Sequence, residues 1–220
     1  MLKIIMTRLR QKTRTIAFPK GPAPVLPARY RGRPIAAGVD AGNLTFAPDD
    51  GVAYAGDFRM AASGRDDLVA GEKEQKLARA LNAEMLRVFG RSIKLRQVSA
   101  GGCNACELDL NVLNTVVFDL SRFGIQFVAS PRHADGLVVT GPVPRNMKDA
   151  LLRTYAAMPE PKIVIAVGTC AITGGLFAEG PEASQGAGAL IPVDLYIPGC
   201  PPHPLTILDG LLRLLGKIRS

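Results

Sequence analysis

The sequence predicts an α/β protein built on an open, mostly parallel sheet, and three observations support this. From Gly90 onward, short apolar runs rich in β-branched residues alternate with segments of helical periodicity, which is the order typical of such sheets. The run Lys162–Val167 is almost wholly apolar, as expected for a strand with both faces covered by helices. All four cysteines follow predicted strands directly, and ligands of open α/β sheets bind outside the carboxyl ends of their strands.

The α/β region contains five predicted strands and three predicted helices. The strands are Ser92–Val98, Ile125–Ala129, Gly136–Thr140, Lys162–Val167 and Asp194–Ile197. The helices are Leu108–Phe123, Arg145–Met158 and Leu205–Ile218. Another helix is predicted over Glu72–Phe89, where apolar residues recur at three- and four-residue spacing before Gly90. Helices on both faces of the sheet complete the expected architecture.

The N-terminal third follows a different pattern. Residues 1–16 predict a short basic amphipathic helix with Leu2, Ile5, Met6 and Leu9 on one face, able to lie on a membrane or a partner. Phe18–Pro34 contains five prolines and is predicted to be an extended strap, because proline is excluded from helix interiors and central strands. Residues 35–68 show no clear periodicity. A largely irregular N-terminal arm is therefore expected before the sheet.

The charge of this arm limits its partners without selecting one. The first 33 residues contain nine basic side chains and no acidic one. A solvated basic arm, contact with anionic lipid headgroups and contact with an acidic partner subunit all fit this charge. Nucleic acid is the weakest candidate, since no recognised binding motif accompanies the charge. No apolar run approaches about 18 residues and no signal peptide is evident, so we expect a cytoplasmic protein without membrane spans.

The four cysteines predict a metal centre. Cys103 and Cys106 lie in one Cys-x-x-Cys turn, whereas Cys170 and Cys200 arrive singly from distant turns. In a reducing cytoplasm, such thiols favour metal binding over disulfides. A structural Zn²⁺ site more often uses two paired motifs, so this arrangement favours a [4Fe–4S] cluster with one thiolate per iron. The alternatives are four unrelated buried cysteines, or a redox dithiol with two spare cysteines.

Four motifs carry a resemblance to a known family. They are GGCNACELDL, RFGIQFVASPRHADGLVVTGPV, IVIAVGTCAITGG and YIPGCPP. Residues 92–216 resemble the small subunit of [NiFe] hydrogenases and the homologous B subunit of respiratory complex I. The resemblance implies a flavodoxin-like fold that holds one [4Fe–4S] cluster beside the active site of a large subunit. The Ni–Fe centre itself would belong to that partner.

The spacing in the first motif separates the two branches of the family. Complex I carries adjacent cysteines there, while Cys103-x-x-Cys106-Glu107 is similar to the membrane-bound, energy-converting hydrogenases of the formate hydrogenlyase type. The implied protein is an electron-transfer subunit on the cytoplasmic face of the inner membrane, with large, membrane and ferredoxin-type subunits as partners. A complex I-like quinone or ferredoxin oxidoreductase subunit whose partner lacks Ni is the alternative. A non-catalytic iron–sulfur or zinc-bound sensor is a third.

A second, weaker resemblance concerns the arm. FPKGPAPVLPARYRGRP and DFRMAASGRDDLV are similar to the flanks of the two-cluster ferredoxin-type subunit of the same complexes, but the cysteine motifs are missing. We therefore expect residues 1–70 to be a degenerate ferredoxin-like arm without a cluster, 71–91 a linking helix, and 92–220 the cluster-binding domain.

Two single residues have competing interpretations. Glu107 directly follows Cys106, and its hydrogenase counterpart implies a role in proton transfer. A carboxylate facing solvent, or stabilised at a helix N-terminus, would explain it equally well. His203, after Pro202, either tunes the cluster or contacts a partner, or simply begins the last helix.

Overall fold

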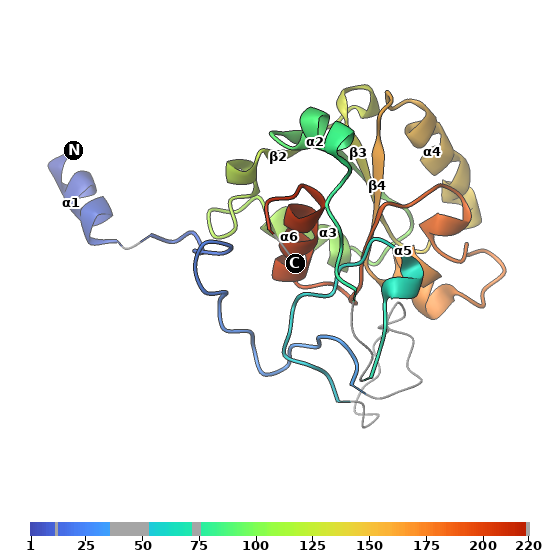
Figure 1. Cartoon of the computed structure of the whole chain (residues 1–220), viewed down its shortest axis with the longest axis horizontal. Coiled ribbons are helices and arrows are strands. Elements are labelled where there is room, and N and C mark those ends of the chain that lie inside the picture. Colours follow the sequence, from blue (N-terminus) through green and yellow to red (C-terminus); the bar gives the residue numbers. More distant parts are fainter. Residues whose placement is uncertain (12, 36–52, 72–75, 219–220) are drawn as a thin grey trace.

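The computed structural model describes residues 1–11, 13–35, 53–71 and 76–218, and it contains a five-stranded sheet in which every neighbouring pair is parallel. The spatial order is β2-β1-β3-β4-β5, which is the flavodoxin-like order of doubly wound sheets. The strands are β1 (Ile93–Ser99), β2 (Ile125–Phe127), β3 (Gly136–Thr140), β4 (Ile163–Val167) and β5 (Leu195–Ile197). The predicted fold class is confirmed (Figure 1).

Helices cover both faces of the sheet. One core contains side chains of α3 (Ala105–Val112) and α6 (Pro204–Leu214) together with Val138 and Ile165 from the central strands. The neighbouring residues Leu137 and Val164 point the other way, into a second core with α4 (Arg145–Ala156). A third, smaller cluster packs α5 (Thr169–Thr173) on that same side, through Ala166. Because alternate strand residues serve opposite faces, the two central strands are buried along their whole length.

The helix predicted over Glu72–Phe89 is much shorter in the structure. Residues 72–75 lie outside the described part of the chain, and α2 spans only Ala83–Phe89. It begins where the side chain of Asn82 accepts a hydrogen bond from the Met85 backbone N–H at 2.8 Å, as an N-cap does. Before it, the N–H groups of Ala78 and Leu81 donate to the carbonyls of Ala61 and Leu214. These two N–H groups bond to other segments of the chain, so they do not form the hydrogen bonds of a helix.

The helix predicted over Leu108–Phe123 is also wrong in extent. It begins earlier, at Ala105, and ends at Val112, where the Thr115 hydroxyl donates to the Val112 carbonyl at 2.7 Å. The chain then turns back, and a short 3-10 segment, η2 (Leu120–Phe123), follows. Leu113 and Leu120 are both fully buried, but through this turn and not along one helix face. Helix α5 (Thr169–Thr173) was not predicted at all.

The arm, residues 1–70, is largely irregular in its described part and is bound to the body of the molecule. Beyond α1 (Leu2–Arg10), its one further helical segment among the described residues is a 3-10 turn, η1 (Arg65–Asp67). The guanidinium of Arg122 donates to the carbonyls of Ile16 at 2.9 Å and Phe18 at 2.8 Å. Ala62 exchanges two backbone hydrogen bonds with Tyr196, which pairs the outer edge of β5 and shields it from other strands.

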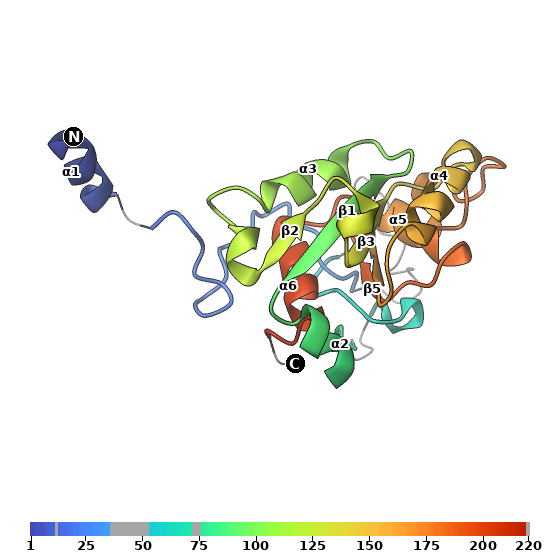
Figure 2. The ribbon, with the colours of Figure 1, turned by 90° about the horizontal axis from the view of Figure 1, so that it is seen from above.

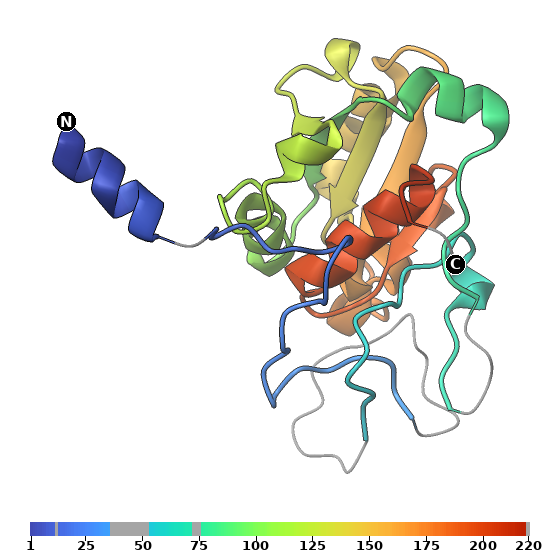
Figure 3. The ribbon, with the colours of Figure 1, turned by 60° about the vertical axis from the view of Figure 1, so that its left-hand side comes forward.

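The strap, residues 18–34, crosses α6 (Figure 3). A cavity of about 970 Å³ is lined by residues of both segments. Asp209 and Arg213 of α6 line this cavity and form an ion pair of 2.7 Å between Oδ2 and Nε. Both side chains are at least 95% buried, and burial raises the pKa of Asp209 while Arg213 opposes that rise. The Nη1 atom of Arg213 has no hydrogen-bond partner among the described residues. None of the helices in the described ranges combines the length and apolar composition needed to cross a membrane.

This ion pair predicts an asymmetric response to mutation. Asp209→Ala should lower the free energy of unfolding by about 3–5 kcal/mol, because it leaves the Arg213 charge buried without compensation. Asp209→Leu combined with Arg213→Met should cost clearly less, since neither charge remains. Urea unfolding of the three proteins measures both effects. A double variant no more stable than the single one would contradict this account.

Candidate metal centre

The four cysteines lie at the carboxyl ends of three strands. Cys103 lies in the turn after β1, and Cys106 in the first turn of α3. Cys170 lies in the first turn of α5, directly after β4, and Cys200 in the turn between β5 and α6. Cys103 and Cys200 are exposed, while Cys106 and Cys170 are partly buried. The candidate centre therefore has two thiols that face solvent and two that are set back into the protein.

The thiols are close enough to act on one another electrostatically. Burial raises the pKa of Cys106, and the charges of Glu107 and of the other three cysteines raise it further. Burial, followed by the charges of Cys200 and Cys103, raises the pKa of Cys170 to about 11. In the absence of a cation these two thiols are therefore protonated at neutral pH. A metal ion bound here would have to displace their protons.

Backbone hydrogen bonds join the turns that carry Cys170 and Cys200. The N–H of Gly168 donates to the carbonyl of Ile197 at 2.9 Å, and the N–H of Thr169 donates to the carbonyl of Gly199 at 2.9 Å. The Thr169 hydroxyl adds a third bond to the same Gly199 carbonyl, at 3.2 Å. Two cysteines separated by 29 residues of chain are thus fixed relative to each other.

Gly168 places the turn of Cys170 directly against Cys106, which belongs to another cysteine-bearing turn. It has a φ of +87°, and a Cβ placed on it would collide with the Sγ of Cys106. A Cβ on Gly175 would likewise approach the Sγ of Cys170 to 2.9 Å. Both positions require glycine because the chain passes directly against a sulfur atom. Gly168 and Gly175 together form a cradle of backbone that lies against the Cys106 and Cys170 sulfurs.

The donor set fits an iron–sulfur cluster. In the part of the chain that the structure describes, no three Cys, His, Asp or Glu side chains are grouped so as to bind a single metal ion. A lone Zn²⁺ needs all its thiolates at about 2.3 Å, whereas a [4Fe–4S] cluster takes each thiolate on a different iron. Four thiols supplied by three turns match in number and kind a cluster that takes one thiolate on each of its four irons.

Glu107 is a buried carboxylate with two hydroxyl partners. Its residue is only 5% exposed, and it lies in the first turn of α3, so the solvent-facing interpretation is wrong. Ser99 Oγ and Thr140 Oγ1 each donate to Glu107 Oε1 at 2.6 Å. Sequence reasoning missed both hydroxyl residues. Their signal was a hydroxyl residue as the last member of a strand, at the sheet edge that the cysteines mark.

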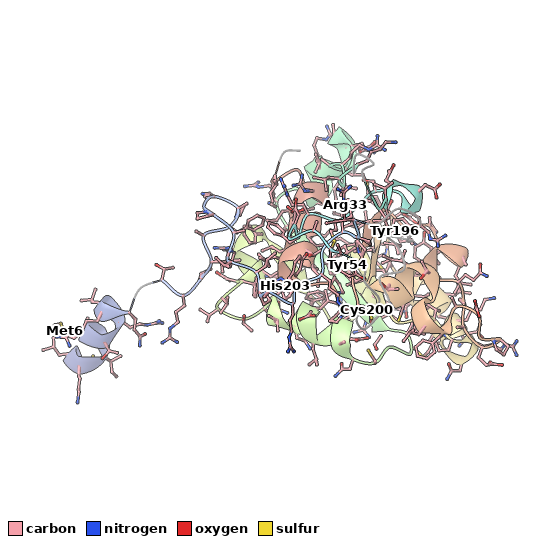
Figure 4. All side chains as sticks on the ribbon, turned by 90° about the horizontal axis from the view of Figure 1, so that it is seen from below. Met6, Arg33, Tyr54, Tyr196, Cys200 and His203 are labelled. Carbon is pink, nitrogen blue, oxygen red and sulfur yellow. The ribbon has the colours of Figure 1, made fainter. Side chains whose placement is uncertain are left out.

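His203 begins α6. Its Nδ1 accepts the backbone N–H of Leu205 at 3.1 Å, which makes it the N-cap, and burial lowers its pKa. The ring of Tyr30, from the strap, packs edge-on against it with centroids 5.7 Å apart. Figure 4 labels Cys200 and His203 on the body of the molecule, far from Met6 of α1. The arm therefore contacts the residue three positions after Cys200.

Comparison with known proteins identifies the family. The family described as "NADH ubiquinone oxidoreductase, 20 Kd subunit" matches residues 103–214, which is just over half of the chain and includes all four cysteines. The chain belongs to this family. Membership places it among the subunits of hydrogenase-like and complex I-like oxidoreductases.

Relatives of this chain come from both branches of the family, the hydrogenase branch and the complex I branch. A probable membrane-bound hydrogenase subunit, mbhJ, of Pyrococcus furiosus is 40% identical over 66% of this chain and 87% of its own length. Formate hydrogenlyase subunit 7 of Escherichia coli is 42% identical over 64% of this chain and 55% of its own. NAD(P)H-quinone oxidoreductase subunit K of Prochlorococcus marinus subsp. pastoris is 48% identical over 54% and 49%. The chain thus spans about half the length of the last two.

A solved structure shares the fold. A chain from the membrane-bound sulfane sulfur reductase, an archaeal respiratory membrane complex, superimposes with a TM-score of 0.54 at 32% identity. The match covers 62% of this chain and 75% of that one. The family match begins at residue 103, so the ferredoxin-like origin of residues 1–70 stays a prediction.

The cradle predicts a steric test of the centre. Gly168→Ala should remove most of the bound iron, because the new Cβ would occupy the space next to the Cys106 sulfur at an unfavourable φ. Gly56→Ala is the matched control, since a Cβ there meets no atom within 4 Å. Iron per chain after anaerobic purification is the measurement. Equal iron in Gly168→Ala and in the wild type would show that this cradle does not enclose the metal site.

Proposed function

We propose that this chain is the electron-transfer small subunit of a membrane-associated [NiFe] hydrogenase. Cys103, Cys106, Cys170 and Cys200 would hold one [4Fe–4S] cluster, which supplies single-electron transfer to and from the active site of a large subunit. The observation that supports the proposal is that Gly168 lies against the Cys106 sulfur, while the charges of Cys103, Cys170 and Cys200 all act on that same thiol. Redox chemistry at nickel and iron would belong to the partner.

The surface around the thiols supports docking of a large subunit. Leu108 of α3, two residues after Cys106, is 56% exposed. Leu176 and Phe177 are 70% and 52% exposed and directly follow Gly175, which lies against the Cys170 sulfur. Large apolar side chains exposed together beside a functional centre are typical of protein interfaces. A partner that also covers the exposed Cys103 and Cys200 would exclude water from the cluster.

The complex would lie on the cytoplasmic face of the inner membrane, with membrane and ferredoxin-type subunits as further partners. Two relatives are named as subunits of a membrane-bound hydrogenase and of formate hydrogenlyase. The Cys-x-x-Cys spacing of Cys103 and Cys106, similar to the hydrogenase branch, favours this branch for the present chain. The 48% identity to a quinone oxidoreductase subunit keeps a complex whose large subunit lacks nickel as the second candidate.

Elemental analysis tests the cluster. The purified chain should contain about four iron and four acid-labile sulfide atoms, as a [4Fe–4S] cluster requires, and Cys170→Ser should lose the native cluster signal. Zinc without sulfide would overturn the assignment, as would an unchanged cluster in Cys170→Ser. About one nickel per large subunit in the isolated complex would support the hydrogenase. Nickel-free complex with quinone or ferredoxin reductase activity would establish the second candidate instead.

Glu107 is the proposed proton-transfer group of this subunit. The Ser99 and Thr140 hydroxyls fix one carboxylate oxygen, Oε1, so the group is held beside the cluster ligands in a defined orientation. Its burial separates it from bulk water. A proton moving between the large subunit and the protein surface would use the carboxylate as an intermediate carrier.

Glu107→Gln tests this role with little change in shape. The Gln carbonyl accepts the same two hydroxyl bonds but cannot carry the proton, so H₂ turnover by the complex should fall roughly a hundredfold. The cluster signal should stay unchanged. Asp109→Asn, on another side of the same helix, is the control and should keep most of the activity. Full turnover in Glu107→Gln would refute the proton role without affecting the cluster assignment.

A further inference from the structure

Helix α1 (Leu2–Arg10) has two chemically distinct sides. Leu2, Ile5, Met6 and Leu9 follow the i, i+3, i+4, i+7 spacing that places side chains on one face. Lys3, Arg8 and Arg10 project from the remaining surface. Every residue of the helix is exposed, and Figures 1 and 2 show α1 standing apart from the sheet and its helices.

Such a helix has little stability of its own. Isolated helices shorter than about 12–15 residues are marginal in water, and α1 has nine residues without a buried one. Its exposed apolar face gains no burial energy from the rest of this chain. A surface that covers that face would therefore stabilise the helix as well as bind it.

A second exposed apolar site lies where the chain leaving α1 is fixed. Val116 and Val117, in the loop after α3, are 60% and 40% exposed. The Thr15 hydroxyl donates to the Val116 carbonyl at 2.8 Å, and the Ile16 N–H donates to the Val117 carbonyl at 2.9 Å. Four residues lie between Arg10 and Thr15, so the five Cα–Cα steps from one to the other reach at most about 18 Å. The end of α1 is therefore held near the valine loop, Val116–Val117.

The charge of the N-terminal segment indicates which kind of surface covers α1. Nine Lys and Arg residues and no Asp or Glu occupy the first 33 positions. A basic helix with a narrow apolar face matches an anionic membrane, where cations meet headgroups and apolar side chains enter the acyl boundary. Nucleic acid would leave the apolar face uncovered, and a protein partner would need a groove that matches a helix of only nine residues.

We propose that α1 and the valine loop form one binding edge for anionic phospholipid membranes. Leu2, Ile5, Met6 and Leu9 insert at the boundary between headgroups and acyl chains, and Lys3, Arg8, Arg10 and Arg14 contact the lipid phosphates. The valines add apolar contact beside the fixed end of the chain. This proposal does not depend on the metal that the cysteines bind.

The edge also orients the molecule. The valine loop follows the C-terminal end of α3, whereas Cys106 lies in its first turn. The eight residues of α3 span about 12 Å at 1.5 Å per residue. Membrane binding at the loop would therefore hold the cysteine turns at the opposite end of this helix, away from the lipid, and leave them accessible to a large subunit.

Vesicle flotation of the full-length chain tests the edge. The chain should float with vesicles of phosphatidylglycerol and phosphatidylcholine at low salt, and much less with phosphatidylcholine alone or at high salt. Replacing Lys3, Arg8 and Arg10 by Gln should weaken binding about a hundredfold, since each basic residue near an anionic surface contributes roughly fivefold. Equal binding to both kinds of vesicle would overturn the electrostatic part.

Two isoleucines in the same turn give a matched comparison. Ile5→Ser should weaken vesicle binding severalfold, because Ile5 lies on the apolar face, and Ile5→Ser with Val117→Ser should weaken it further. Ile4→Ser, an equal change on another side of the helix, should bind almost like the wild type. All three side chains are exposed, so the iron content should stay constant. Identical binding by the Ile4 and Ile5 variants, or no vesicle binding by the wild type together with capture of an acidic subunit, would refute the proposal.

Discussion

The candidate site depends on one constraint, which is the parallel alignment of strands whose carboxyl ends meet at a single edge. β1, β4 and β5 each end in a cysteine-bearing turn, and β3 lies between them. The turn after β3 provides Gly141, whose Cα lies 3.4 Å from where a Cβ on Gly102 would be. Register and not a local motif therefore determines the geometry. A shift of one residue in β4 would turn the following side chains to the opposite face of the sheet and move Cys170 away from its counterparts.

Much of this arrangement could be predicted from the sequence, because several strands can be recognised from their apolar composition. β3 and β4 are short, largely apolar runs rich in β-branched residues, which favours strands covered on both sides. The order of strands and helices then placed the cysteines at one edge. Predicting a metal centre needed nothing beyond this placement and the chemistry of thiols. The hydroxyl bonds to Glu107 required knowing which strands are neighbours, since Ser99 and Thr140 come from different strands.

The errors arose where tertiary contacts overrode local periodicity. The pattern before Gly90 is helical, but the N–H groups of Ala78 and Leu81 bond to distant carbonyls, and only the part after Asn82 forms a helix. Leu113 and Leu120 have helical spacing, yet a turn joins them, with the Leu120 N–H donating to the Leu113 carbonyl at 3.0 Å. A helix and a turn can bury the same apolar side chains, so apolar spacing alone does not distinguish the two. Hydrogen bonds outside the helical pattern decided each case.

The covalent link between the arm and the sheet has a thermodynamic consequence. The bonds from Arg122 to Ile16 and Phe18, and the packing of Tyr30 on His203, would each be weak contacts between separate proteins. Within one chain they form at an effective concentration set by a short connection, in the millimolar range for flexible linkers. The local concentration of the arm at the sheet therefore does not depend on how much protein is present. The link gives one arm for each sheet, whatever the strength of the individual contacts between them.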